Sequence, residues 1–418
     1  MRAEDVRADF PLLDSSVNGH PLVYLDSAAT AQKPLAVLEA EREFLTTTNA
    51  AVNRGAHTLA ARATDAFDDA RAAVARFVGA RDDEIVWTSN ATEGINLIAT
   101  ALSNASTADA QYRSLALTPG DEIVVTELEH HANLIPWQQL AQRTGAVLRY
   151  IPVDDDGALL LDTLESVVTP RARIVAVSHV SNVLGTVTPL EPIIARAHEV
   201  GALIVLDACQ SVPHLPVDVR ALDVDFAVFS GHKMLGPTGI GALYGRRELL
   251  EALPPASTGG SMITTVTMER AEFLPPRLRF EPGTQRVSQA VALAEAVRYL
   301  ERIGMPAVAD HSVRLGARLV EGLRQLDGVR VLGDTSGAPR IGLASFEVAG
   351  VHAHDVGQFL DDRGIAVRVG HHCAQPLHRR LGLVASARAS ASVYTTDEEI
   401  DVFLEALAEV PAFFGVGR

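Results

Sequence analysis

The sequence predicts an α/β protein with a large, mostly parallel central sheet and a smaller α+β region toward its C-terminal end. Between residues 22 and 245, short runs of Val, Ile and Leu alternate with longer amphipathic stretches, a pattern typical of strands joined by crossover helices. Several of these runs are apolar at nearly every position, as in strands that helices cover on both faces. The length of 418 residues leaves room for a second, smaller domain.

The elements follow in order along the chain. The strands predicted for the large sheet cover 84–88, 122–126, 146–151, 173–178, 202–207, 225–230 and 240–244. Helices are predicted over 59–78 and 190–200, where apolar residues recur on one side. The Ala-, Ser- and Thr-rich segment 103–118 lacks periodicity, and we expect it to be a surface insertion.

A different organisation begins near residue 300. The sequence there predicts a helix over 310–326, followed by strands over 341–348, 365–369 and 390–394. We therefore expect a large domain over 20–299 and a small C-terminal domain over 300–418, with segment 1–19 packing nearby.

Composition and charge exclude several classes of function. The chain has 36 basic and 52 acidic side chains and a net charge of −16, which disfavours nucleic acid as a partner because phosphate binding depends on clustered Lys and Arg. No apolar run approaches the roughly 20 residues that span a bilayer. The first residues carry no signal-peptide pattern, so we expect a cytoplasmic protein with reduced thiols. Two cysteines, Cys209 and Cys373, cannot form a disulfide scaffold or a four-cysteine metal site.

Two neighbouring predicted strands end in residues that carry chemistry. Asp207 ends the strand 202–207, where it either caps the next turn or pairs with a cation. Lys233 follows the strand 225–230, and a desolvated lysine amine can form a Schiff base with an aldehyde. A carboxylate and a lysine at adjacent strand ends suit pyridoxal phosphate, whose ring nitrogen pairs with the carboxylate and whose aldehyde binds the lysine.

A phosphate would need backbone amides and hydroxyl groups, which the start of a helix offers. Thr92 opens a helix-like run after the strand 84–88, and Ser230 and His232 could complete the same cup. The alternative is ordinary helix capping without a ligand.

His130 follows the strand 122–126 and could stack on the cofactor ring or move protons. Its alternatives are a structural role and a metal-binding role. The metal-binding role is disfavoured because the HExxH spacing is absent.

Cys373 lies in the segment RVGHHCAQPLH, residues 368–378. Its basic neighbours Arg368, His371 and His372 would increase the thiolate fraction, which is the nucleophilic form. A zinc site made of His371, His372, Cys373 and His378 is the competing interpretation. Cys209 lies in an apolar run, where a small buried thiol is expected.

Taken together, these segments resemble group II cysteine desulfurases of the SufS type, which are fold-type I pyridoxal-phosphate enzymes of the class V aminotransferase superfamily. The resemblance extends from Tyr24 to Tyr394 and is most specific in SGHKMLGPTGIG from Ser230, HVSNVLGT from His179 and RVGHHCA from Arg368. The short loop that carries the cysteine favours group II.

The resemblance implies a role for each matching position. Lys233 would be the Schiff-base lysine, Asp207 the partner of the ring nitrogen, and His130 a catalytic residue stacked on the ring. Cofactor contacts are further implied for Asn182, Gln210, Ala91, Thr92, Ser230, His232 and, from the neighbouring subunit of a homodimer, Thr284. The substrate would be bound by Arg388, His57 and Arg368. The chain departs from the family at Cys209, where Ala is common, and at Gln285, where Pro is usual.

The activity implied by the resemblance is conversion of L-cysteine to L-alanine, with the sulfur carried as a persulfide on Cys373. A SufE- or SufU-like protein would accept this sulfur for iron–sulfur cluster assembly. The nearest alternatives are a selenocysteine lyase, acting on L-selenocysteine, and a cysteine sulfinate desulfinase. A transaminase, which would not need Cys373, and a non-catalytic scaffold in the assembly complex are the others.

Overall fold

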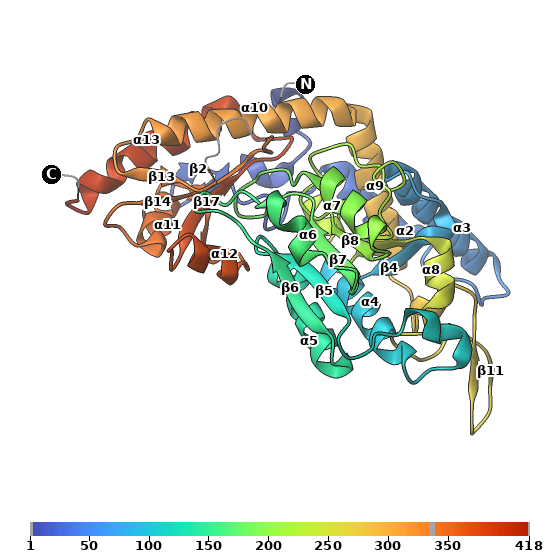
Figure 1. Ribbon diagram of the computed structural model, residues 1–418. Helices are drawn as coiled ribbons and strands as arrows, with labels where there is room; N and C mark the ends of the chain where they lie inside the picture. Colours follow the sequence, from blue (N-terminus) through green and yellow to red (C-terminus); the bar gives the residue numbers. More distant parts are fainter. Residues whose placement is uncertain (1–2, 334–338, 417–418) are drawn as a thin grey trace.

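A computed structural model describes residues 3–333 and 339–416, and its centre is a seven-stranded sheet in the order β4-β10-β9-β8-β7-β5-β6 (Figure 1). The strands are β4 (Ile85–Thr88), β5 (Glu122–Thr126), β6 (Val147–Ile151), β7 (Ala172–Ser178), β8 (Leu203–Asp207), β9 (Phe226–Ser230) and β10 (Gly241–Gly245). Their ends differ from the predicted ones by no more than one residue. Within this sheet only β10 runs opposite to the direction that the other strands share, so the predicted α/β class with a mostly parallel sheet is confirmed.

Helices cover both faces of this sheet, which explains why its strands are apolar at nearly every position. Val175 and Val177 of β7 pack into one core, whereas Ile174 and Ala176, which alternate with them, pack into the other. The first core contains side chains of α2 (Leu35–Thr47), α3 (Thr58–Phe77), α7 (Leu190–Glu199) and α9 (Val287–Ile303). The second contains side chains of α4 (Ala91–Ala105), α5 (Ile135–Thr144) and α8 (Arg247–Ala252).

A four-stranded antiparallel sheet in the order β13-β14-β17-β16 forms the second centre. Its strands are β13 (Val329–Val331), β14 (Leu343–Val348), β16 (Arg368–Gly370) and β17 (Ser386–Ser390). A separate core joins this sheet to α10 (Met305–Arg324), α11 (Ala353–Asp361) and α13 (Asp397–Phe413). Figure 1 shows α10 running along the top of the molecule from α9 to this sheet. The division into domains 20–299 and 300–418 stays a prediction.

The N-terminal segment lies beside the second sheet. Its strand β3 (Val23–Tyr24) pairs in parallel with β15 (Ile365–Ala366), and Asp26 forms a bridge with Ser390. The short elements elsewhere are α1 (Glu4–Arg7), β1 (Ser16–Val17), β2 (His20–Pro21), α6 (Leu164–Val167) and α12 (Gln375–Arg380). The pairing of β3 with β15 thus places the residues that follow β3, from Asp26 onward, at the junction of the two sheets.

Four sequence-based expectations need correction. The strand predicted over 390–394 is instead β17 (Ser386–Ser390), whose Ser- and Ala-rich sequence is buried but lacks the apolar pattern used to find strands. The strand predicted over 365–369 is divided into β15 and β16. The segment 103–118 is not a plain surface insertion, because α4 continues to Ala105 and the ring of buried Tyr112 lies 5.2 Å from the Arg279 guanidinium. The helix predicted from 310 begins at Met305, since Pro306 fits the first turn of a helix.

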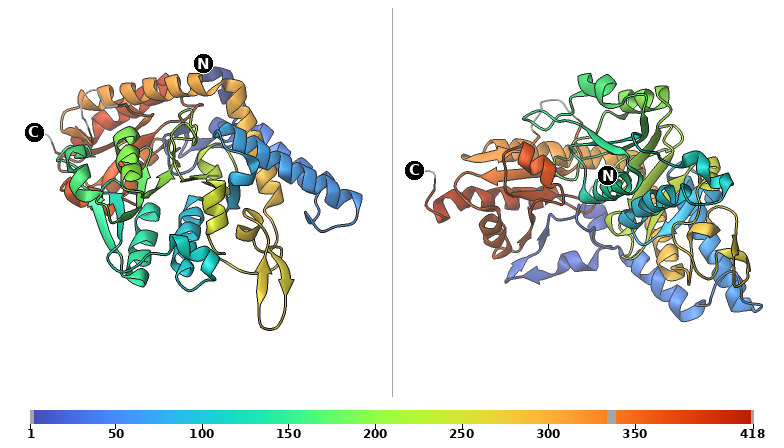
Figure 2. Two further views of the ribbon diagram at one scale, coloured as in Figure 1. Left: turned by 45° about the vertical axis from the view of Figure 1, so that its right-hand side comes forward. Right: turned by 60° about the horizontal axis from the view of Figure 1, so that its bottom comes forward.

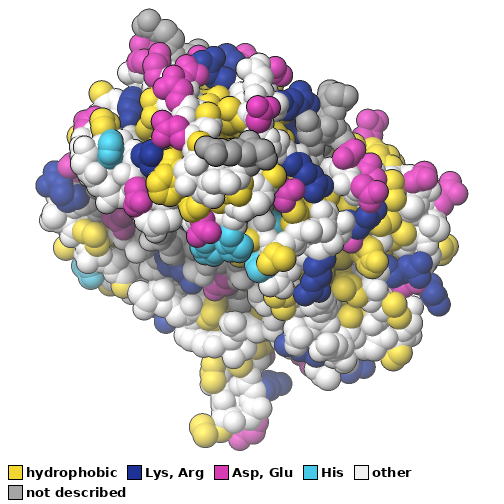
Figure 3. Space-filling view, turned by 90° about the vertical axis from the view of Figure 1, so that its left-hand side faces the viewer, with side chains coloured by type: hydrophobic (Ala, Val, Ile, Leu, Met, Phe, Trp, Pro, Cys, Tyr) yellow, Lys and Arg dark blue, Asp and Glu magenta, His cyan; other side chains and the backbone are white. Residues whose placement is uncertain are grey.

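The surface carries one prominent projection. The hairpin of β11 (Ile263–Val266) and β12 (Ala271–Phe273) extends from the body in Figure 1 and in the left view of Figure 2, and Met268 near its tip is 96% exposed. Acidic and basic side chains are interspersed over the face shown in Figure 3. Among the described residues, no helix is both long enough and apolar enough to cross a membrane.

A buried ion pair joins α3 to the segment before α9. Arg71 donates from Nη1 and Nη2 to the two Glu281 carboxylate oxygens at 2.6 and 2.9 Å, and both side chains are at most 2% exposed. The Trp87 backbone N–H also donates to Glu281. The guanidinium lies about 5 Å from the rings of Phe67 and Trp87. The buried charge of each side chain is compensated only while the other side chain is present.

We therefore expect Arg71→Met to lower the free energy of unfolding by about 3–5 kcal/mol, because it leaves the Glu281 carboxylate buried without its cation. Urea denaturation at pH 7 measures this loss. The matched control is Arg42→Met, which removes an exposed pair with Glu39 and should cost less than about 1 kcal/mol. Equal losses in the two variants would contradict the importance assigned to the buried pair.

Candidate active site

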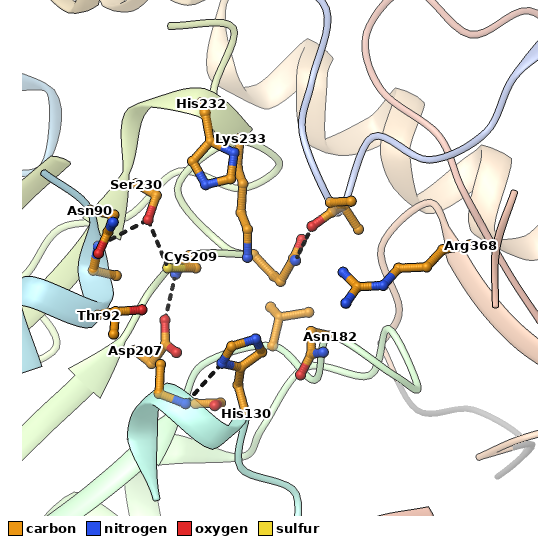
Figure 4. A pocket seen from close by; sticks show the side chains of 17 residues that line it. Asn90, Thr92, His130, Asn182, Asp207, Cys209, Ser230, His232, Lys233 and Arg368 are labelled. Carbon is orange, nitrogen blue, oxygen red and sulfur yellow. Dashed lines mark hydrogen bonds between the residues drawn. The ribbon is translucent and has the colours of Figure 1, made fainter. Parts of the chain in front are cut away.

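A cavity of about 230 Å³ opens at the carboxyl ends of β8 and β9, where ligands of open α/β sheets bind (Figure 4). The predicted site residues that line it are Ala91, Thr92, His130, Asn182, Asp207, Gln210, Ser230, His232, Lys233 and Arg368. Residues from six separate segments of the chain therefore meet at one place, as expected for a site at the ends of parallel strands.

Asp207 and Lys233 reach this cavity because β8 and β9 are parallel neighbours. Asp207 is the last residue of β8, is 7% exposed, and accepts a hydrogen bond from the Cys209 N–H at 3.0 Å through Oδ1. Lys233 ends the short 3₁₀ turn Gly231–Lys233 that follows β9. Both side chains point into the same open space in Figure 4. A buried carboxylate and an amine thus face one ligand-sized volume.

The N-terminus of α4 forms another wall. The Asn90 side chain caps this helix by accepting from the Glu93 N–H at 3.0 Å, and Ser230 Oγ accepts from the Ala91 N–H at 3.0 Å. Gly94 lets the helix pack closely on β9, since a Cβ there would lie 2.8 Å from a methyl carbon of Val228. The positive end of the helix dipole therefore faces the cavity, where it favours an anion.

His130 enters from the loop after β5. Its Nδ1 accepts from the Ala132 N–H at 3.0 Å, so the neutral ring carries its proton on Nε2. Burial, and next the charge of Lys233, lowers the pKa of His130 to about 4. Burial and the charges of Lys233 and Lys33 lower the pKa of His232 to the same value. Both rings are therefore neutral near pH 7.

Glu129 anchors the loop that carries His130, and sequence analysis did not single it out. Its buried carboxylate accepts from Thr126 Oγ1, from Asn133 Nδ2, and from both the backbone N–H and the hydroxyl of Ser178, over 2.6–3.0 Å. Burial raises the pKa of Glu129 to about 7 despite these donors. The carboxylate thus joins the loop to the end of β7.

Cys373 lies on the loop 371–374 between β16 and α12, and its side chain is half-buried. His372 and Cys373 have φ of +48° and +58°, a left-handed conformation that costs about 1–2 kcal/mol for each residue with a side chain. The His131 N–H donates to the Cys373 carbonyl at 2.7 Å. Arg368 Nη2 donates to Cys373 Sγ at 3.4 Å, so the thiol is one side chain away from the cavity that Arg368 lines.

Arg388 lies in β17 opposite Arg368 and is 1% exposed. Its Nη1 donates to the Asn182 carbonyl at 2.8 Å and its Nη2 to Asp26 Oδ1 at 3.3 Å, while Nε has no partner among the described residues. Burial lowers the pKa of Arg388 to about 10 and raises that of Asp26. A buried guanidinium with an open N–H is suited to bind a carboxylate.

Four of the predicted site residues do not line the cavity. Cys373 and Arg388 lie next to residues that do, whereas the other two lie apart from it. His57 is exposed at the start of α3, where its Nδ1 caps the helix by accepting from the Ala60 N–H. Thr284 is exposed as well, beyond β12 and before α9. The start of α3, drawn in blue, lies at the far end of the molecule in Figure 2. Within one chain, His57 therefore does not reach the substrate pocket, and the role of each residue stays a prediction that requires a second subunit.

Sequence analysis missed other lining residues, notably Ala28, Ala29 and Asn90. The small residues after β3 in the run Asp26-Ser-Ala-Ala-Thr30 were the available signal. Cys209 is buried as predicted, yet it also lines the cavity, with Sγ 3.7 Å from Ser230 Oγ. Burial, and next the charge of Asp207, raises the pKa of Cys209 to about 12, so this thiol stays protonated.

The alternative zinc site is not formed. The described residues contain no group of three His, Cys, Asp or Glu side chains placed to share a metal ion. His372 and His378 are instead engaged with Ser386, each through Nε2.

Comparison with known proteins gives a consistent result. Residues 23–403 match the aminotransferase class-V family. The chain is 56% identical to the probable cysteine desulfurase 2 of Mycobacterium leprae over 98% of its length and 97% of the relative's. A solved cysteine desulfurase from Thermococcus onnurineus NA1 superposes with a TM-score of 0.91 at 40% identity, covering 98% of each chain. A solved structure of C-DES with glycine covalently linked to its PLP cofactor is 26% identical with a TM-score of 0.77, covering 96% of this chain and 99% of that one.

The lowered pKa of His130 predicts a pH dependence. Because its folded pKa is about 4 and its ordinary value 6.5, the unfolded chain binds this proton first as the pH falls through that window, and the free energy of unfolding decreases. We expect the wild type to lose up to about 1.4 kcal/mol per pH unit more than His130→Gln between pH 6.5 and 4. Urea denaturation of both proteins at several pH values checks this, and equal slopes would refute it.

Proposed function

The chain belongs to the aminotransferase class-V family, and we propose that it is a cysteine desulfurase, which converts L-cysteine to L-alanine and carries the sulfur as a persulfide on Cys373. The observation that carries this proposal is the contact between Arg368 and Cys373 Sγ at the wall of the cavity that also holds Lys233 and Asp207. A transaminase would have no use for a cysteine in that position.

The cofactor is pyridoxal 5′-phosphate, and the residues of the cavity fit it. The Gln210 side-chain oxygen is buried without a donor, although its Nε2 donates to the Ala28 carbonyl at 3.0 Å. An uncompensated buried acceptor at the cavity wall indicates that a ligand completes the site. Lys233 would bind the aldehyde, Asp207 the ring nitrogen, and the N-terminus of α4 with Ser230, His232 and Thr92 the phosphate.

The cofactor, when bound, supplies an aldehyde and an electron-accepting ring. Asn182 presents its side chain to the same cavity, while His130 Nε2–H offers a proton beside the ring site. Arg388 would bind the substrate carboxylate through the N–H groups that Asn182 and Asp26 leave open. Lys233, whose amine would hold the cofactor aldehyde, would also act as the base that takes the proton from the substrate Cα.

Cys373 performs the sulfur step. Its thiolate attacks the substrate sulfur, so that an S–S bond forms on Cys373 while the substrate Cβ–S bond breaks. The carbon skeleton then takes up protons and leaves as alanine. Arg368 lies against the attacking sulfur at 3.4 Å and stabilises the negative charge that the step requires.

We assign the chain to the SufS-type group II because the cysteine loop comprises only residues 371–374 between β16 and α12.

A homodimer would bring Thr284 and His57 to a neighbouring cavity, since both are exposed in one chain. A SufE- or SufU-like acceptor would then take the persulfide sulfur toward iron–sulfur clusters. A reduced, cytoplasmic location suits a reaction that depends on a free thiol. Nucleic acid and membrane have no part in this proposal.

The cysteines provide the central test. We expect Cys373→Ser to lower sulfide release from L-cysteine at least 100-fold, because no thiolate remains to take the sulfur. Cys209→Ala should keep activity within about threefold, since that thiol is protonated. Assays of sulfide and alanine with a reductant measure both. Full activity of Cys373→Ser on L-cysteine would instead favour a selenocysteine lyase or a cysteine sulfinate desulfinase.

Lys233 provides a test of the cofactor assignment. Purified wild type should absorb near the visible edge through lysine-bound cofactor, and Lys233→Ala should lose that band together with all activity. The neighbouring Lys33, which bonds to Thr30 and to the His232 carbonyl, supplies the control: Lys33→Arg should keep the band. A band that survives in Lys233→Ala would overturn the assignment.

A further inference from the structure

Next to Cys373 the structure contains a row of buried hydrogen bonds that the proposed sulfur chemistry does not use. His372 Nε2 and His378 Nε2 lie 3.0 and 2.9 Å from the same oxygen, Ser386 Oγ. His378 Nδ1 lies 3.0 Å from the Ala374 carbonyl oxygen. The three side chains are at most 2% exposed. The row therefore connects the residue before Cys373 to the residue after it through one hydroxyl.

The Ala374 carbonyl at one end of this row sets the direction of every hydrogen bond in it. The Ala374 carbonyl can only accept, so His378 carries its proton on Nδ1, and Nε2 of the neutral ring is an acceptor. The Ser386 hydroxyl therefore donates to His378 and accepts from His372 Nε2–H. His372 Nδ1 then has no proton, in agreement with the absence of a partner for it among the described residues.

The reverse direction is unfavourable. It would require a second proton on His378 and would place the His372 proton on Nδ1, a buried N–H without an acceptor. The charged and titratable groups that face the row disfavour added protons: Arg368 of β16, Arg388 of β17 and His371 of the loop. Burial and these neighbours lower the pKa of His372 to about 2 and also lower that of His378. The row thus has one direction at physiological pH.

The loop 371–374, which this row binds, needs contacts from other segments to keep its conformation. His372 and Cys373 are both left-handed without being glycine, a conformation that persists only where surrounding contacts impose it. Ser386 binds the loop on both sides of Cys373, through the His372 side chain and, by way of His378, through the Ala374 carbonyl.

The position of Ser386 in the second sheet links this support to the substrate site. Ser386 pairs with Gly370 and Arg388 pairs with Arg368 in the same ladder. Ser386 and Arg388 are two residues apart in β17, so their side chains lie on one face of the strand. Strand β17 therefore holds both the Ser386 hydroxyl, which binds the cysteine loop, and the Arg388 guanidinium, which is predicted to bind the substrate carboxylate.

We propose that Ser386 is a positioning residue which, through His372 and His378, holds the Cys373 loop in register with Arg388, so that Sγ meets the sulfur of a substrate bound by its carboxylate. This inference rests on the proposed desulfurase function for its consequence in catalysis. The hydrogen-bonded row itself does not depend on that function.

The test compares the wild-type holoenzyme with Ser386→Ala. Amide hydrogen exchange of a peptide covering 371–376, followed by mass spectrometry, should be at least tenfold faster in the variant, because the His372 and His378 side chains both lose their bond to β17. With L-cysteine, kcat should fall at least tenfold while KM changes less than threefold and the cofactor absorption stays unchanged, since Arg388 and Lys233 remain in place. Unchanged exchange in the loop would overturn the proposal.

Matched variants separate positioning from a general loss of packing. Ser386→Thr keeps the hydroxyl and should retain wild-type exchange within threefold. Ser312→Ala removes another buried serine hydroxyl, which bridges His214 and the Gly342 N–H away from the cysteine loop, and should leave exchange at 371–376 and kcat unchanged. The same acceleration in Ser312→Ala, or in Ser386→Thr, would refute a specific role for the Ser386 hydroxyl.

A second substitution covers the case in which Ser386→Ala does not fold. His378→Gln can still accept from Ser386 but loses the side-chain bond to the Ala374 carbonyl, which keeps only the backbone N–H of residue 378. Exchange at Ala374 and Gln375 should therefore accelerate at least threefold. Unchanged exchange at these two amides would contradict the positioning role proposed for the row of hydrogen bonds. Hydrogen exchange needs no turnover, so a wild type that releases no sulfide from L-cysteine would refute the proposed function alone.

Discussion

The whole site depends on hydrogen bonds that meet at Asn182. Its carbonyl accepts from Arg388 at 2.8 Å, and its side-chain Nδ2 donates to the His372 carbonyl at 2.6 Å. The segment that follows β7 is thereby joined to two segments of the second sheet, the strand that carries the buried arginine and the loop that carries the cysteine. Asn182 also lines the cavity beside Asp207 and Lys233. A shift of either sheet would therefore move the nucleophile relative to the cavity, which couples the packing of the sheets to the geometry of the reaction.

Electrostatics is the second constraint on the site. Lys233, Arg368 and Arg388 gather around one cavity and the loop beside it, a concentration of positive charge that suits a phosphate, a carboxylate and a thiolate. The same charges, together with burial, keep His130, His232 and His372 neutral. Neutral rings can donate at one nitrogen and accept at the other, so each histidine forms directional hydrogen bonds. Burial and the Asp207 carboxylate keep the Cys209 thiol protonated. Cys373, by contrast, is half-buried and contacts the Arg368 guanidinium.

The sequence predicted the large sheet well because its strands, covered on both faces, leave an unbroken apolar signal. It predicted the second sheet less well. The strand Ser386–Ser390 is built from Ser, Ala and Arg, and it is buried because its small side chains fit between neighbours and because Arg388 finds partners in distant segments. Neither property is visible in a local pattern. The same limit explains why Glu129 and Ser386 were missed, since their roles arise from contacts with Ser178 and with His372 and His378.

By itself, the sequence determined the α/β class, the positions of the large sheet's strands along the chain and the chemistry available at their ends, including Asp207, Lys233 and His130. These follow from short-range patterns and from the rule that parallel strands expose their carboxyl ends at one edge. Only the tertiary structure decided that Cys373 lies one side chain from the cavity, that Arg388 is bound by Asp26 and Asn182, and that His57 and Thr284 do not line the cavity of their own chain. The reason is that these relations join segments more than a hundred residues apart, and only the packing of the two sheets and the helices between them sets their distances.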